Sequence, residues 1–154
     1  MAKLEAGDVA PELSLEDENG STISLSDYRG RRVVVYFYPA DDTPGCTKEA
    51  CQFSDLFDEF TAAGVDVIGI SPDDASSHRR FREKHGLTVR LLSDPDHRVM
   101  EAYGAWGEKT LYGRKSVGVI RTTYLVGPDG RIERAWHHVR ADGHPAKVLA
   151  ALSA

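Results

Sequence analysis

The sequence contains only two cysteines, and this scarcity excludes several kinds of protein. A disulfide-dense secreted domain needs more cysteines, and an all-cysteine zinc site needs four. The chain also lacks a long apolar run, because its longest, from Val33 to Tyr38, is far too short to cross a bilayer. A surplus of positive charge is missing as well, since 24 acidic residues outnumber 19 basic ones and the net charge is −5. We therefore expect no nucleic-acid partner.

The rest of the composition is typical of one globular domain. A length of 154 residues with 41% hydrophobic residues suits a single domain, which we expect to cover residues 1–154. The start of the chain has no apolar stretch of signal-peptide length. We therefore expect a cytoplasmic protein without a membrane partner, whose thiols are kept reduced.

The order of the predicted elements indicates an α/β fold. The unbroken apolar run from Val33 to Tyr38 predicts a central strand that is buried on both faces. Asn19-Gly20 predicts an N-terminal β-hairpin. The predicted strands are 13–15, 22–25, 32–39, 65–70, 89–92, 119–126 and 131–138, and the predicted helices are 44–63, 76–85, 96–105 and 144–152. This order predicts a mixed central sheet flanked by helices, an arrangement that the thioredoxin fold has.

The start of the helix predicted at 44–63 holds a candidate nucleophile. Thr43 suits the N-cap position, Pro44 the first helical position and Cys46 the third. Unpaired backbone N–H groups and the positive end of the helix dipole stabilise a thiolate at such a place. Cys46 also lies on the apolar face of the helix, where a pocket can shield its sulfur. The alternative is that Cys46 fills space in the core as a small apolar residue.

Cys51 follows five residues later, and this spacing separates the two thiols. In a regular helix, five residues correspond to about 140° of rotation and about 8.6 Å between Cα atoms, whereas a disulfide needs about 7 Å or less. Cys46 and Cys51 therefore cannot bond unless the first turns of the helix unwind. Cys51 is expected on the polar flank, near Lys48, Asp55 and Asp58. The alternative is an inert thiol, because the spacing matches neither C-x-x-C nor a metal pair.

Arg121 is the second candidate, because it is the single charge within the strand predicted at 119–126. A buried arginine must be paired or hydrogen-bonded, and a thiolate in a pocket beside the sheet could be its partner. The alternative is an arginine on an edge strand that faces water.

The motif around Cys46 is part of a likeness that extends over nearly the whole chain. The pattern Pro39-x-x-x-Thr43-x-x-Cys46 resembles the active-site signature of the peroxiredoxins. The run TPGCTKEAC that ends at Cys51 is similar to the Q-type branch of that family, the bacterioferritin comigratory proteins. Further similar segments are Gly7–Pro11, Val67–Ser71, Leu92–Pro95, Tyr112-Gly113, the strand of Arg121 and Gly143-His144.

The resemblance implies a thiol-dependent peroxidase on a thioredoxin fold, with no cofactor and no metal. It implies that peroxide, either hydrogen peroxide or an organic hydroperoxide, oxidises Cys46 to a sulfenic acid. Cys51 would then resolve this acid as an intramolecular disulfide, and thioredoxin or a similar dithiol would reduce the disulfide. The implied role is antioxidant defence, and a monomer is expected because Q-type relatives are commonly monomers.

The resemblance also implies roles for the residues around the reactive sulfur. Pro39 would shield the sulfur, and the hydroxyl of Thr43 would hydrogen-bond the peroxide and the thiolate. Arg121 would stabilise the thiolate and the developing charge on oxygen, and Glu49 would orient Arg121. Backbone N–H groups from Gly45 onwards could add to this stabilisation, and Gly45 lowers the helix propensity where unwinding is required.

Two other functions stay open from the residues alone. A disulfide reductase of the thioredoxin type shares the fold but requires C-x-x-C at the helix start, where Cys46 is instead followed by Thr47-Lys48-Glu49. A non-enzymatic module could use both cysteines structurally, or bind a metal together with some of the six scattered histidines. Insulin reduction tests for the first function, and metal content after purification tests for the second.

Overall fold

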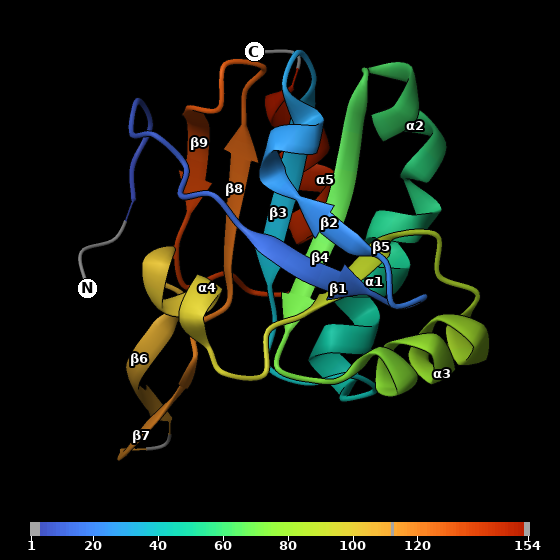
Figure 1. Cartoon of the computed structure of the whole chain (residues 1–154). Coiled ribbons are helices and arrows are strands. Elements are labelled where there is room, and N and C mark those ends of the chain that lie inside the picture. Colours follow the sequence, from blue (N-terminus) through green and yellow to red (C-terminus); the bar gives the residue numbers. More distant parts are fainter. Residues whose placement is uncertain (1–3, 112, 153–154) are drawn as a thin grey trace.

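The computed structural model describes residues 4–111 and 113–152 and shows a twisted sheet with helices on both faces (Figure 1). The strands are β1 (Ser14–Asp17), β2 (Thr22–Ser24), β3 (Arg32–Phe37), β4 (Val65–Ser71), β5 (Arg90–Ser93), β6 (Trp106–Leu111), β7 (Arg114–Val119), β8 (Thr122–Val126) and β9 (Ile132–Trp136). The helices are α1 (Pro44–Asp55), α2 (Phe57–Ala62), α3 (Ala75–His85), α4 (Arg98–Ala102), α5 (His144–Ala151) and the short 3-10 helix η1 (Leu25–Tyr28). Among the described residues, none of these helices has the length and apolar character needed to cross a membrane.

The main sheet has seven strands in the order β2-β1-β5-β4-β3-β8-β9. The β3–β4 and β4–β5 pairs are parallel, and the other pairs are antiparallel. The predicted mixed sheet is therefore confirmed, and the β1–β2 pair is the predicted N-terminal hairpin. Gly20 occupies its turn with φ of 80°, a conformation that glycine adopts without steric cost.

The residues of β3 face two separate cores, because successive side chains of a strand point to opposite faces. Val33, Val35 and Phe37 join the core that also contains residues of η1 and α4. Val34 and Tyr36 join the core formed with α1, α2, α3 and α5. Figure 1 shows α4 and α5 on opposite sides of the sheet. A strand without polar alternation is thus explained by burial on both faces.

Gly69 of β4 makes room for an aromatic stack beneath α1. It is paired with Tyr36 of β3, and a Cβ at position 69 would lie 2.6 Å from the Cζ atom of the Tyr36 ring. That ring stacks on Phe53 of α1 with 4.7 Å between the centroids. The missing side chain therefore lets Tyr36 lie flat on the sheet and α1 pack directly over it.

Two predicted helices are shorter than the sequence pattern suggested. The helix predicted at 44–63 divides into α1 and α2 at Leu56, whose φ of −98° and ψ of 10° depart from helical values. The helix predicted at 96–105 is only α4, because His97 has a left-handed backbone with φ of 64°. The apolar pattern of the first segment gave its buried face, but the sequence did not reveal either backbone break.

The prediction of one strand over 119–126 is wrong. β7 ends at Val119 and β8 begins at Thr122, so Arg121 lies in a short connection and not in a strand. The β6–β7 hairpin was not predicted, because β7 is mostly exposed and neither strand has a regular apolar alternation. It forms a sheet of its own and projects at the lower left of Figure 1. The chain must turn to leave this hairpin and enter the main sheet, and Arg121 lies at that turn.

Candidate active site

Cys46 lies in the first turn of α1, at the third helical position. Thr43 precedes the helix with an extended backbone, and Pro44 begins it. The N–H of Thr47 donates to the carbonyl oxygen of Thr43 at 2.8 Å, which closes the first turn. Cys46 is only 2% exposed and belongs to the core between α1 and the sheet. Its sulfur is therefore shielded and lies at the positive end of the helix dipole.

Thr43 occupies the predicted N-cap position, but its hydroxyl does not cap the helix. The hydroxyl donates to the carbonyl oxygen of Ala40 at 2.8 Å, within the same loop. A hydroxyl has one donor and two acceptor lone pairs. The Thr43 oxygen is consequently left as an acceptor toward any third group.

Arg121 reaches Cys46 across the gap between the β7–β8 connection and α1. Its Nη2 atom lies 3.2 Å from Sγ of Cys46, and its Nη1 atom lies 2.5 Å from Oε1 of Glu49. Its side chain is 16% exposed, so the alternative that it faces water is wrong. Burial by itself lowers the pKa of Arg121, but the charges of Glu49 and Cys46 raise it above its usual value. The guanidinium therefore stays positive beside the sulfur.

Glu49 lies one turn after Cys46 on α1, and its side chain is fully buried. Burial raises the pKa of Glu49 to about 7, against the opposing effect of Arg121. Its Oε2 atom has no hydrogen-bond partner among the described residues, which makes the ionised form costly. The positive charge of Arg121 is thus only partly compensated near neutral pH.

Gly45 and Pro39 complete the set of predicted residues near Cys46. A Cβ at Gly45 would lie 3.4 Å from Nη2 of Arg121, an ordinary contact distance, so the guanidinium passes directly beside this position. Pro39 lies half-buried in the loop between β3 and α1. Its role as a shield of the sulfur stays a prediction.

Cys51 shares α1 with Cys46 but has a different environment. Both thiols are free, and α1 is continuous across them. Cys51 is half-buried, and burial together with the nearby charge of Asp55 raises its pKa. The structure thus brings Cys46, Glu49 and Arg121 together and leaves Cys51 outside their contacts.

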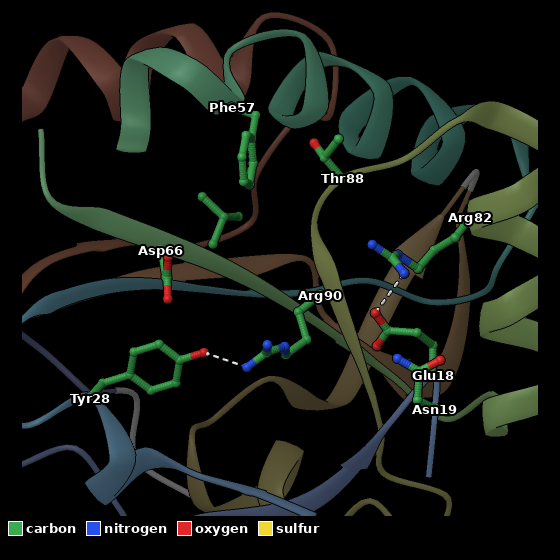
Figure 2. Close-up of a pocket in the computed structure, with 9 residues that line it drawn as sticks. Glu18, Asn19, Tyr28, Phe57, Asp66, Arg82, Thr88 and Arg90 are labelled. Carbon is green, nitrogen blue, oxygen red and sulfur yellow. Dashed lines mark hydrogen bonds and ion pairs between the residues drawn. The ribbon is translucent and has the colours of Figure 1, made fainter. Parts of the chain in front are cut away.

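A cavity of about 300 Å³ lies away from this cluster and is shown in Figure 2. It is lined by Glu18, Asn19, Tyr28, Phe57, Asp66, Val67, Arg82, Thr88 and Arg90. None of the predicted site residues lines it. Glu18 is paired with Arg82 at 2.8 Å there, and Tyr28 is hydrogen-bonded by Arg90 at 3.3 Å.

The metal-binding alternative receives no candidate site from the part of the chain that the structure describes. No group of three or more His, Cys, Asp and Glu side chains could hold a metal ion there.

Asp41 and His78 form a buried pair beside Thr43 that was not predicted. They lie 37 residues apart, and no spacing rule links two such positions.

A buried cysteine that lies at a helix start and faces an arginine is an arrangement typical of thiol-based oxidoreductases. Residues 6–135 match the model of the AhpC/TSA family. The chain therefore belongs to the AhpC/TSA family.

Similar proteins lie in one branch of this family, the peroxiredoxin Q or bacterioferritin comigratory proteins. A putative peroxiredoxin of Mycobacterium tuberculosis is 54% identical over 151 residues, which cover 98% of this chain and 96% of the relative. Peroxiredoxin Bcp of Escherichia coli is 46% identical over 149 residues, covering 97% and 96%. These relatives confirm the resemblance to the Q-type branch.

Solved structures confirm the thioredoxin fold. The bacterioferritin comigratory protein of Xanthomonas campestris, solved to explain its alkyl peroxide reduction activity, has a TM-score of 0.89 at 37% identity, covering 97% of this chain and 98% of that one. A cysteine-to-serine mutant of PrxQ from Xylella fastidiosa has a TM-score of 0.92 at 35% identity, covering 99% and 98%.

Proposed function

We propose that this chain reduces hydrogen peroxide and organic hydroperoxides with Cys46 as the attacking thiolate. The observation that carries the proposal is the 3.2 Å contact between Nη2 of Arg121 and the buried sulfur at the start of α1. Membership of the peroxiredoxin family supports a peroxidase of the oxidoreductase class. The alkyl peroxide reduction activity of the Xanthomonas campestris relative supports organic hydroperoxides among the substrates.

The first step is a displacement at oxygen. The Cys46 thiolate attacks the terminal peroxide oxygen, the S–O bond forms and the O–O bond breaks, so the sulfur becomes a sulfenic acid. The departing oxygen takes the electron pair, gains from solvent the proton that the Cys46 thiol released on ionising, and leaves as water or an alcohol. The guanidinium of Arg121 and the N–H groups at the start of α1 are the groups that offset the charge developing on oxygen.

Thr43 has a defined part in this step because its donor is already used. Its O–H group donates a hydrogen bond to the carbonyl oxygen of Ala40. The Thr43 oxygen therefore accepts the hydrogen bond from the peroxide O–H and turns the peroxide toward the sulfur. Pro39, in the same loop, would limit access of water to the sulfur.

The second step is resolution by Cys51. The thiol of Cys51 attacks the sulfenic sulfur of Cys46, the S–S bond forms, the S–O bond breaks and water leaves. Both cysteines lie on the continuous helix α1, so this step requires the first turns of α1 to unwind. Gly45 lies in the turn that must open.

A dithiol reductant then regenerates both thiols by exchange with the disulfide. We propose thioredoxin or a similar dithiol protein, acting in a reducing, cytoplasmic setting where it contributes to antioxidant defence. One helix holds both cysteines, so we propose a monomer formed by a single domain over residues 1–154. The contact of α5 with α1, beyond the residues matched by the family model, supports this single unit.

The Cys46→Ser substitution tests the proposed nucleophile. Serine is hardly ionised near neutral pH, so peroxide reduction with thioredoxin is expected to fall below detection. Peroxide consumption would be followed through oxidation of the reductant, with the native fold checked by circular dichroism. Turnover that persists in this variant would exclude Cys46 as the nucleophile.

The Cys51→Ser substitution tests the resolving step separately. The first oxidation is expected to proceed at the rate of the unmodified protein, and the product is expected to stop at the sulfenic acid. Thiol titration and mass spectrometry after one equivalent of peroxide would show the added oxygen. A disulfide between Cys46 and another group in this variant would contradict the assignment of Cys51.

A further inference from the structure

A buried cluster holds the loop between β3 and α1, and the proposed chemistry does not use it. Asp41 lies in this loop shortly before Thr43, and its side chain is 3% exposed. Its carboxylate accepts hydrogen bonds from Oη of Tyr38 at 2.6 Å and from Oγ of Ser77 at 2.7 Å. Nδ1 of His78 lies 2.7 Å from the same carboxylate. One buried side chain thus joins the loop to α3.

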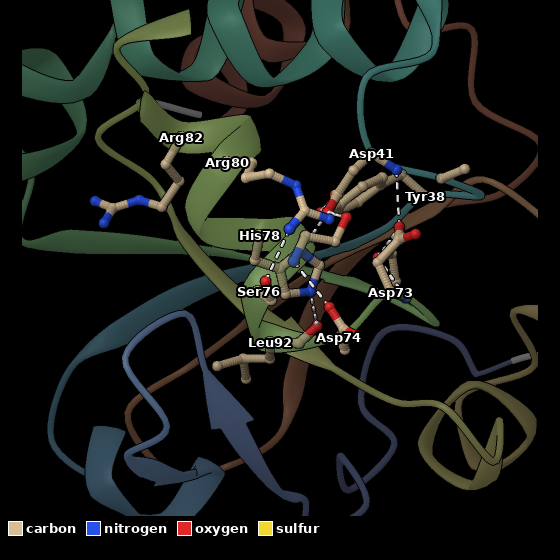
Figure 3. A network of polar contacts seen from close by, with 12 residues as sticks. Tyr38, Asp41, Asp73, Asp74, Ser76, His78, Arg80, Arg82 and Leu92 are labelled. Atoms are coloured by element: carbon tan, nitrogen blue, oxygen red, sulfur yellow. Dashed lines mark hydrogen bonds and ion pairs between the residues drawn. The ribbon is translucent and has the colours of Figure 1, made fainter. Parts of the chain in front are cut away.

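His78 continues this connection to the main sheet. Its side chain has no exposed surface, and its Nε2 atom lies 3.1 Å from the carbonyl oxygen of Leu92 in β5, as Figure 3 shows. Carboxylate and carbonyl oxygens are both acceptors, so each ring nitrogen faces an acceptor. The ring is therefore held between the loop and β5, and hydrogen bonds to a carboxylate are strong where water is excluded.

The backbone of the loop is fixed at the same residue. The N–H of Asp41 donates to Oδ2 of Asp73 at 2.8 Å, and Oγ of Ser71 at the end of β4 donates to the same oxygen at 2.7 Å. Both the main chain and the side chain of Asp41 are therefore attached to other elements. We call the contact of Asp41 with His78 the loop tether.

We propose that the loop tether is a positioning element that sets how often the first turn of α1 unwinds. The proposal rests on the proposed function, in which Cys46 and Cys51 form a disulfide with loss of water. The loop leads directly into α1, so a loop that is fixed at Asp41 restricts the movement of the first turn. Breaking the tether releases the segment that must open.

The tether acts on the two chemical steps unequally because they use different conformations. Attack on peroxide uses the folded turn, which is the major state in both presence and absence of the tether. Disulfide formation uses the unwound turn, which is a minor state. In this proposal the tether breaks when the turn unwinds, so its removal raises the minor population in proportion, while the major population hardly changes. Only the second step is therefore accelerated.

The main test uses the double variant Asp41→Ala/His78→Leu. Replacing both partners leaves no unpaired buried charge, so the fold is retained where a single replacement could lose it. His78→Asn is the conservative variant, because its amide can donate to Asp41 in place of Nδ1 but cannot also reach Leu92.

A matched control is available on the same helix and in the same loop. His85 contacts Asp42 at 2.8 Å, but this pair is partly exposed, with 23% and 44% of the side chains accessible. Asp42→Asn/His85→Leu removes the exposed pair, and asparagine tolerates the φ of 60° at position 42. Met100→Ala is the second control, because Met100 is buried in the core on the opposite face of the sheet and lowers overall stability without touching the loop.

Two rates would be measured after rapid mixing with hydrogen peroxide, namely sulfenic acid formation at Cys46 and the appearance of the Cys46–Cys51 disulfide. The double variant is expected to form the disulfide about tenfold faster, which corresponds to a change of about 1.4 kcal/mol in the equilibrium between the folded and the unwound turn. The rate of sulfenic acid formation is expected to change less than about twofold. His78→Asn is expected to give an intermediate acceleration, and Asp42→Asn/His85→Leu less than about twofold. Hydrogen exchange of the reduced protein is expected to accelerate over residues 43–51 in the double variant.

The proposal is overturned if the double variant changes neither the exchange of residues 43–51 nor the disulfide rate. It is also overturned if Met100→Ala accelerates both as much as the double variant, because overall stability would then explain the effect. If the unmodified protein forms no Cys46–Cys51 disulfide, the proposed function fails at its second step. The exchange comparison still decides whether the tether controls the turn.

Discussion

Cys46 and Cys51 are the same residue type on the same helix, yet their surroundings differ in three respects. Cys46 is buried, lies in the first turn and faces the guanidinium of Arg121. Cys51 is half-buried and lies in the middle of α1 near the negative charge of Asp55. A cation beside a sulfur favours its thiolate, whereas burial and a nearby anion favour the thiol. In the proposed mechanism, the same helix holds the attacking sulfur in its first turn and the resolving sulfur in its middle.

This difference arises from parts of the chain that are distant in sequence. Arg121 comes from the β7–β8 connection, while both cysteines come from the helix that follows β3. The helix provides the N–H groups and the spacing, and the sheet provides the positive charge. Three substitutions test how far the helix and the arginine each account for the difference between Cys46 and Cys51.

Arg121→Ala is expected to have the largest effect, because it removes the charge that distinguishes the two thiols. The rate of peroxide reduction is expected to fall by about 10² to 10³-fold. Alkylation of Cys46 at neutral pH is also expected to slow, because no cation then lies beside its sulfur. Arg121→Lys keeps the charge but not the two-pronged contact with Glu49 and Cys46, so its rates should lie between those of the unmodified protein and Arg121→Ala. Rates of peroxide reduction and alkylation that do not change would remove Arg121 from the site.

Glu49→Gln tests the partly compensated charge around Cys46. The pKa of Glu49 is about 7 in the folded protein and 4.5 ordinarily, so the folded state binds more protons in this window. Its contribution to stability therefore falls as the pH rises through the window. Relative to Glu49→Gln, the free energy of unfolding of the unmodified protein is expected to fall by up to about 3 kcal/mol between about pH 5 and about pH 8. Urea denaturation of both proteins at each pH would measure this, and a difference that is independent of pH would contradict it.

Gly45→Ala is expected to have the smallest effect and concerns the turn that separates the thiols. The added Cβ lies at an ordinary contact distance of 3.4 Å from Arg121. Alanine favours the helix by up to about 1 kcal/mol, so disulfide formation is expected to slow by up to about fivefold. Sulfenic acid formation should change little. The lifetime of the sulfenic acid after rapid mixing measures this effect, and a faster disulfide step would show that unwinding does not limit it.

The sequence was sufficient for the elements whose signals are local. The apolar run of β3, the Asn19-Gly20 hairpin and the helix start before Cys46 each depend on neighbouring residues, and each was predicted correctly. The ends of helices were predicted less well, because neither Leu56 nor His97 is a residue type that marks a helix boundary in the sequence, yet both have non-helical backbone angles. The β6–β7 hairpin escaped prediction because exposed strands lack apolar alternation.

The candidate site shows the same division. Cys46 and its place in the helix could be inferred from the TPGC motif, and a buried partner for Arg121 could be inferred from charge burial. The exact donor atoms could not, since they depend on the turn between β7 and β8. The Asp41–His78 contact left no signal, because it joins a loop to a helix through two residues that no spacing rule relates.

Position 69 shows how a functional centre can depend on a residue with no functional group. A side chain there would strike the ring of Tyr36 at 2.6 Å, and this ring supports Phe53 of α1. A larger residue would lift the helix and carry Cys46 away from Arg121, although it would alter no reactive atom. A survey of substitutions would therefore find that position 69 accepts only glycine. The cause would be the displaced helix, because every residue of the site itself would be unchanged.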